Sequence, residues 1–313
     1  MVNWCRLRRQ LIGDFDPGKI PPRIEVPVLP RALNDFIQRA EQPDVTALEL
    51  GKCIESDVGL TCELLRLVNS SALGIRDKAS TAQRAISVLG VHRSKLTLLT
   101  AAVQKYLKPR EFRDFDYDGF CAANLERALF AQHFAKAFRT DADLAFAGAM
   151  LVDCLIPKLD DELPGFYPVF AETSPQTKPR LIDHEERALG WTHAMAAAQI
   201  MLGWKFPDDL ICCVALHHCP ENTIQHAELK TSAAAAVALA ALAPDPLMQE
   251  PHGLPTLLNL GLIIPGMNFE IVAAAVAQEF IAAGVPKGKH LLVADRSAQP
   301  GPARERREVA VST

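Results

Sequence analysis

Apolar residues recur at helical spacing along most of the chain, and almost no segment alternates as a strand would. After Pro30, for example, four apolar residues follow an i, i+3, i+4, i+7 pattern: Leu33, Phe36, Ile37 and Ala40. The best candidate strand, residues 24–29, contains a proline, so we expect extended coil there. The sequence therefore predicts an all-α protein.

Start signals and periodicity place the helices. Thr46 with Glu49 three residues later fits a capping box, and Asp57 fits an N-cap. We predict helices over 33–40, 46–54, 57–68, 91–103, 120–138, 142–156, 182–189, 192–202, 207–217, 233–243 and 269–283. Prolines and a glycine populate residues 157–180, which predicts a loop-rich stretch. From residue 285 the periodicity is lost, which predicts a flexible tail over 285–313.

Composition excludes several classes of protein. With 313 residues, 49% hydrophobic and 22% charged, the chain can bury a large core and is not disordered. A net charge of −4 does not favour binding to nucleic acid. The short basic runs at 6–9 and 304–307 are typical of solvated chain ends. No apolar run is long enough to span a membrane, and no secretory signal is evident. We expect a cytoplasmic protein whose eight cysteines are reduced and mostly buried.

Residues able to bind a metal gather in one region. Asp153 lies in a predicted apolar helix, His193 starts another, and the pair His217–His218 ends a third. A buried carboxylate is costly unless it is paired or metal-bound, and adjacent imidazoles can bind a metal ion. A purely structural role is the alternative: Asp153 would bond a neighbouring helix end and His217 would be a satisfied core histidine. Three cysteines near the histidine pair lack C-x-x-C spacing, so we expect core thiols: Cys212, Cys213 and Cys219.

Several segments together resemble the HDOD domain, a relative of the HD-type phosphohydrolases. The matching stretches are IPPRIEVPVLP at 20–30, IESDVGL at 54–60, LLRLVNS at 64–70, AISVLG at 85–90, FAGAMLVD at 146–153, Glu185 followed by LGWTHA at 189–194, WKFP at 204–207 and the histidine pair at 217–218. The resemblance implies an HDOD-type helical half packed on a degenerate HD-like helical bundle. We divide the chain into an N-terminal segment (1–19), the HDOD domain (20–220), a C-terminal helical extension (221–284) and the tail.

The resemblance also implies which metal ligands remain. HD-type hydrolases bind one or two metals through a first His, a His-Asp pair, further histidines and a last Asp. Here the pair reads Val152-Asp153, and the first His would fall near residues 123–124, where neither residue is a histidine. The last Asp would fall in 233–243, where only small apolar residues occur. The remaining set is Asp153, His193, His217 and His218, which we expect to form a polar core linking helices or a vestigial, weak divalent-metal site.

This incomplete set predicts function. We expect a non-catalytic signalling or regulatory module in bacterial signal transduction, acting through other signalling proteins or a small ligand, with no cofactor beyond a weakly held divalent metal and no membrane or nucleic-acid partner. The alternative is a metal-dependent phosphohydrolase or phosphodiesterase with a reduced site. Three further residues match the family motif: Asp57, Asn69 and Ser70. For Asn69 we expect a left-handed cap at a helix end, with a ligand contact as the alternative.

Overall fold

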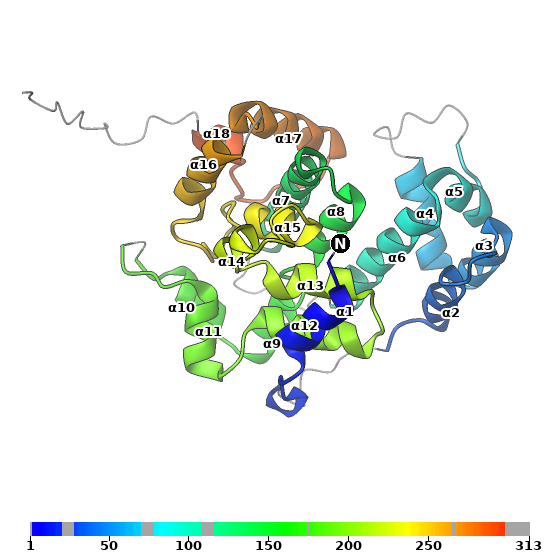
Figure 1. Cartoon of the computed structure of the whole chain (residues 1–313), viewed down its shortest axis with the longest axis horizontal. Helices are drawn as coiled ribbons and strands as arrows, with labels where there is room; N and C mark the ends of the chain where they lie inside the picture. The colour runs from blue at the N-terminus through cyan, green and yellow to red at the C-terminus, as the bar shows by residue number, and fades with distance from the viewer. Residues whose placement is uncertain are drawn as a thin grey trace, which may run out of the picture.

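The computed structural model describes residues 2–20, 28–69, 78–107, 116–174, 176–264 and 267–297. Within these ranges every regular element is a helix, which confirms the predicted all-α fold. A smaller N-terminal lobe lies beside a larger helical bundle (Figure 1). In the part of the chain so described, no helix has the length and apolar character needed to cross a bilayer.

Five helices make the N-terminal lobe: α2 (Arg31–Ala40), α3 (Ala47–Glu55), α4 (Val58–Val68), α5 (Ala82–Leu89) and α6 (Val91–Tyr106). α3 packs on α2 and α5, and α6 contacts α2, α4 and α5. Both predicted start signals are confirmed. Thr46 and Glu49 form a capping box, and the Asp57 side chain accepts a hydrogen bond from the Leu60 amide.

Five more helices form the centre of the bundle: α7 (Tyr117–Phe138), α8 (Ala142–Leu151), α12 (His193–Gly203), α13 (Asp208–Leu216) and α15 (Ala233–Ala240). α15 contacts α7, α8 and α13, and all its residues are buried. Small residues allow this close packing, since a Cβ at Gly148 of α8 would lie 2.8 Å from the Cβ of Cys213. Residues of the segment 221–284 therefore contribute to the same core as the helices that precede them.

The remaining helices cover this centre: α1 (Trp4–Ile12), a 3-10 turn (Pro17–Lys19), α9 (Ile156–Glu162), α10 (Phe166–Ala171), α11 (Leu181–Leu189), α14 (Pro220–Gln225), α16 (Gly253–Ile263), α17 (Phe269–Ala283) and α18 (Val293–Ser297). α1 packs on α13, and Arg8 pairs with Asp208 at its start. Part of the basic N-terminal run is thus folded onto the bundle. The loop-rich prediction for 157–180 misses α9 and α10, because a proline in the first turn of a helix removes no hydrogen bond.

The predicted flexible tail is wrong for residues 285–297, which we call the C-terminal segment. Glu126 of α7 is 1% exposed, and its carboxylate accepts hydrogen bonds from His290 Nε2 and the Val293 amide, both at 2.8 Å. The Lys289 amide donates to Asp116 beside the start of α7. These contacts hold the segment on α7. Residues 298–313 lie outside the described part of the chain.

Candidate metal centre

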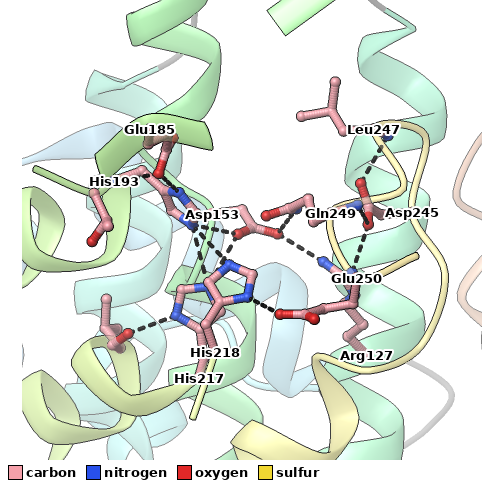
Figure 2. Close-up of polar contacts among 12 residues, drawn as sticks. Arg127, Asp153, Glu185, His193, His217, His218, Asp245, Leu247, Gln249 and Glu250 are labelled. Atoms are coloured by element: carbon pink, nitrogen blue, oxygen red, sulfur yellow. Dashed lines mark hydrogen bonds and ion pairs between the residues drawn. The ribbon is translucent and has the colours of Figure 1, made fainter. Parts of the chain in front are cut away.

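Four polar side chains from three helix ends meet inside the bundle. Asp153 lies in the turn after α8, His193 is the first residue of α12, and His217 and His218 directly follow α13 (Figure 2). Their side chains are between 0 and 3% exposed. One ligand atom from each lies within 4.8 Å of the others. The structure therefore brings together all four residues predicted as the remaining metal set, which we call the four-residue cluster.

A proline sets the position of Asp153. The helix predicted over 142–156 ends at Leu151, because Pro157 has no amide hydrogen for the Asp153 carbonyl, and its ring would clash with that carbonyl in a continuous helix. The Ile156 amide bonds the Asp153 carbonyl instead, at 3.0 Å. The sequence predicted Asp153 inside a helix, whereas in the structure it lies at a break between two helices.

A short turn sets the position of His193. Gly190 ends α11 with φ 74°, a left-handed conformation that suits glycine, and Thr192 caps α12 by accepting a hydrogen bond from the Met195 amide. Glu185 of α11 then holds His193 twice, because its Oε2 accepts from the backbone amide at 2.9 Å and from Nδ1 at 2.8 Å. The hydroxyl of Tyr167 donates to the other oxygen of Glu185.

Each imidazole of the cluster has its Nδ1 bonded away from the centre. His193 Nδ1 donates to Glu185, His217 Nδ1 to the Val214 carbonyl at 2.7 Å, and His218 Nδ1 to Glu250 at 2.6 Å. Because these acceptors hold a hydrogen on each Nδ1, a neutral ring directs the lone pair of its Nε2 atom toward the centre of the cluster. Figure 2 shows the rings turned toward a common point. The distance from His193 Nε2 to the other two Nε2 atoms is 3.3 Å.

The two oxygens of Asp153 have different surroundings. Oδ2 accepts from Arg127 Nη1 and from Gln249 Nε2, both at 2.8 Å. Oδ1 has no hydrogen bond of normal geometry, although it is buried. It lies 3.3 Å from His193 Nε2 and 3.4 Å from His217 Nε2. One oxygen is therefore held by the fold, while the other faces the histidines.

A second layer of buried charge surrounds the cluster, and sequence reasoning missed most of it. Arg127 of α7 is 2% exposed and also donates to Asp245 and to the Ala243 carbonyl. Arg180 pairs with Glu250 through two bonds of 2.8 Å. Arg127 stands among apolar residues of a predicted helix, and Asp245 follows the Ala-rich segment by two positions. A charged residue within or beside an apolar stretch of the sequence was the available signal for Arg127 and Asp245.

The field at the cluster favours one positive charge. Burial opposes an imidazolium at His193, yet the carboxylates of Glu185 and Asp153 outweigh it and raise the pKa of His193 to about 10. Burial and the neighbouring His217 lower the pKa of His218 to about 3. Burial also opposes the charge of Asp153, but the adjacent His193 and His217 rings and the guanidinium of Arg127 hold its pKa well below the usual range. Without a metal, the cluster is a carboxylate and one imidazolium beside two neutral imidazoles.

The donor set fits a divalent metal ion. Donors about 2.1 Å from a tetrahedral zinc ion lie about 3.4 Å apart. Four donor–donor distances in the cluster are 3.3 or 3.4 Å. Histidines whose Nδ1 atoms bond a carboxylate or carbonyl are typical of metal sites, since these bonds orient the ring. The orphaned Oδ1 of Asp153 supplies the fourth donor.

The other predicted residues lie elsewhere. Asp57 only caps α4, and Ser70 lies outside the described residues. Asn69 has φ −90°, so the left-handed cap is wrong. Its side-chain amide instead makes two hydrogen bonds with the backbone of Ala79, at 2.7 and 2.8 Å, which join the two ends of residues 70–78.

No cysteine belongs to the cluster, although Cys154 and Cys219 directly follow Asp153 and His218 in the chain. The group of donors contains no cysteine, although Cys212 and Cys213 are buried in the bundle core. The expectation of mostly buried thiols is wrong, because two of the eight are exposed and four are partly exposed.

Comparisons with known proteins agree on one family. The model of the HDOD domain matches residues 26–220. Among solved structures, the chain is similar to a candidate phosphohydrolase from Shewanella amazonensis SB2B, with a TM-score of 0.62 and 21% identity over 87% of this chain and 99% of the other. It is also similar to an HDOD domain protein of unknown function from Geobacter sulfurreducens, with a TM-score of 0.61 and 18% identity over 92% of this chain and 100% of that one. At these identities the likeness shows the fold alone.

A curated relative adds no activity. An uncharacterized protein of Treponema pallidum (strain Nichols) is 22% identical over 208 residues, which are 64% of this chain and 39% of the relative. The chain thus spans well under half the length of that protein.

Proposed function

Because the chain belongs to the HDOD domain family, we propose that it is a non-catalytic regulatory module of bacterial signal transduction, built around one divalent metal ion. Asp153, His193, His217 and His218 would hold the ion. The proposal rests on one observation above all: three Nε2 atoms and Asp153 Oδ1 face a common point, while the outward ring nitrogens and Asp153 Oδ2 are already bonded.

The number of protein donors supports a structural metal. Four donors complete a tetrahedral site, whereas catalytic zinc sites keep one position open for water or substrate. The side chains of the cluster are between 0 and 3% exposed, so the donor atoms themselves are buried away from a phosphodiester substrate. When bound, the ion would act as a cross-link between the ends of α8, α12 and α13.

Arg127 supports a site for a single ion. Two-metal hydrolases use a pair of ions about 3.5–4 Å apart to stabilise the attacking and leaving oxygens. In this chain the second oxygen of Asp153 is taken by Arg127 and Gln249, and Asp245 is taken by the same guanidinium. The guanidinium of Arg127 therefore occupies the side of Asp153 on which a carboxylate that bridges two metal ions would bind the second ion.

The regulatory role follows from this cross-link. Gain or loss of the ion would change how firmly three helix ends are held together, and other signalling proteins would respond to that difference. The family membership supports a signalling context, and the buried donors support a role in conformation rather than in turnover.

Metal content tests the proposal. The protein is purified without a histidine tag or chelator and analysed by elemental mass spectrometry beside the double variant His193→Ala/His217→Ala. We expect about one divalent ion per chain in the parent and a loss of at least about tenfold in occupancy in the double variant. His226→Ala is the control, because His226 is exposed and lies outside the cluster. Folded parent protein that takes up no zinc, manganese or iron on reconstitution would refute the metal centre.

The enzymatic alternative is tested on the same samples. The metal-loaded protein is incubated with bis(p-nitrophenyl) phosphate, and release of nitrophenol is followed. We expect no turnover above buffer. Turnover by the parent that disappears in the double variant would replace the regulatory proposal with a phosphodiesterase.

A further inference from the structure

A pocket of about 270 Å³ lies against the outer side of the metal centre. The residues after α13, the first turn of α16 and the residues before α11 form its walls. Six titratable residues line it: Arg180, His218, Cys219, Glu221, Glu250 and His252. We call it the Arg180 pocket. His218 belongs both to the pocket and to the four-residue cluster, so the two sites share a side chain.

The positive groups of the pocket point to an anion. The Arg180 side chain is 39% exposed, and its Nε and Nη2 atoms bond Glu250 and the His218 carbonyl. Nη1 has no partner among the described residues, so one edge of the guanidinium is free for a ligand. His252 adds an exposed imidazole.

The N-terminus of α16 also favours an anion in the pocket. Gly253 and Thr256 of its first turn line the pocket, and that turn carries no acidic side chain. A helix N-terminus carries a partial positive charge that favours anions. Against these groups stand two carboxylates. Glu250 is already paired with Arg180 and His218, and Glu221 is exposed.

One carboxylate connects the pocket to the cluster. Glu250 Oε1 accepts from His218 Nδ1 at 2.6 Å and from Arg180 Nη2 at 2.8 Å. Arg180 also donates to the His218 carbonyl, so it holds both the backbone of His218 and the group that orients its ring. A ligand that draws Arg180 into the pocket must change the support of His218.

We propose that the Arg180 pocket binds a small oxyanion, a phosphate group or a carboxylate, and that its occupancy changes the metal affinity of the four-residue cluster through Glu250 and His218. The coupling rests on the proposed metal centre, whereas oxyanion binding does not. By linkage, the ion must change oxyanion affinity by the same factor.

The first experiment measures oxyanion binding to the metal-free protein by calorimetry. Sulfate is the tetrahedral probe, because it resembles phosphate without precipitating zinc, and acetate is the carboxylate probe. Arg180→Gln and Arg180→Lys remove the planar guanidinium, and Arg187→Gln on the exposed side of α11 is the matched control. We expect about tenfold weaker binding in both Arg180 variants and no change in the control.

A second variant predicts the opposite sign. Glu221→Gln removes an exposed negative charge from the wall of the pocket without touching Arg180 or His218, so oxyanion binding should strengthen by about threefold. This prediction does not depend on whether the Arg180 variants fold. Binding of either sulfate or acetate supports an oxyanion site. The probe that binds more tightly shows whether the site prefers a phosphate group or a carboxylate. The proposed oxyanion site would be overturned if the parent bound neither probe. It would also be overturned if folded Arg180→Gln bound the probes as tightly as the parent.

The coupling is measured by zinc competition against a chromophoric chelator, with and without saturating probe. We expect the probe to change the zinc dissociation constant by at least about threefold in the parent and in Arg187→Gln, but not in Arg180→Gln. An unchanged zinc affinity in probe-saturated parent would overturn the coupling. If zinc does not bind at all, the proposed metal centre fails, and the calorimetry on metal-free protein still decides the pocket.

Discussion

At the residue scale, Asp153 shows how one carboxylate can serve two purposes. Its Oδ2 accepts from Arg127 and Gln249, and its Oδ1 faces two histidines without a hydrogen bond of normal geometry. An unpaired buried oxygen is unfavourable unless something occupies the site with it. The fold therefore orients Asp153 through Arg127 so that Oδ1 stays available. We predict that Arg127 is a positioning residue for the metal centre.

The variant Arg127→Met tests this role because it removes the guanidinium and keeps a flexible, unbranched side chain. It leaves Asp153 and Asp245 as buried carboxylates that have lost their cation, which should cost about 3–5 kcal/mol of unfolding free energy in urea denaturation. Zinc affinity, measured by chelator competition, should fall about 10–100-fold because Asp153 loses its orienting partner. Arg187→Met is the exposed control. Zinc affinity unchanged in the folded variant would show that Arg127 acts on stability alone.

The residues of the site were predictable to different degrees. Asp153 and the three histidines could be assigned from the sequence, because a recognisable family pattern contains them. Arg127, Asp245 and Glu250 could not, since their partners are 26, 118 and 32 residues away and depend on how the helices pack. A charge inside an apolar stretch indicates that a partner exists, but sequence alone does not identify it.

At the element scale, two helix starts were predicted correctly, whereas the end of α8 was not. The capping box of Thr46 and the N-cap of Asp57 depend on residues within one turn, which the sequence shows directly. The end of α8 depends on Pro157, six residues beyond the last helical position. A proline breaks hydrogen bonding to the residue four positions before it, so counting back from Pro157 indicates a break at Asp153. Apolar residues at helical spacing continue past Asp153, which led to the prediction of one continuous helix over 142–156.

The junction of α6 with α8 predicts a pH dependence. His92 in the first turn of α6 bonds Asp141, the N-cap of α8, at 2.8 Å. The hydrogen bond with Asp141 raises the pKa of His92 above its usual 6.5. Because the folded pKa exceeds the unfolded one, this pair stabilises the protein most below about pH 6.5, and the contribution is lost as pH rises through the folded pKa.

The variant His92→Gln isolates this contribution. Both side chains are partly exposed, so the expected loss is at most about 1 kcal/mol. Urea denaturation of the parent and the variant at about pH 5.5 and at about pH 8.5 should give a larger difference at the lower pH. His226→Gln serves as an exposed control. A difference that grows with pH would show that His92 does not act as the charged partner of Asp141.

At the scale of the whole molecule, the bundle is assembled from segments far apart in sequence. α1 packs on α13, α15 lies between α7, α8 and α13, and the C-terminal segment lies on α7. The extent of the family resemblance suggested a boundary at 220, and the loss of apolar periodicity suggested a free tail after 284. Both segments are defined by their partners. α15 is buried because α7, α8 and α13 pack around it, and the C-terminal segment is held by Glu126.

Truncation tests whether the C-terminal segment belongs to the folded unit. Ending the chain at Gly284 removes His290 and Val293, and leaves the buried carboxylate of Glu126 without either donor. We expect a loss of about 3–5 kcal/mol in urea denaturation, as for a buried charge deprived of its partner. Ending the chain at Ser297 is the control, since it keeps both donors, and its stability should match the parent. Adding Glu126→Gln to the shorter chain removes the unpaired charge and should restore part of the loss. Equal stability of the two truncated chains would place the segment outside the cooperative core, whereas rescue by glutamine would identify the carboxylate of Glu126 as the reason the segment is needed.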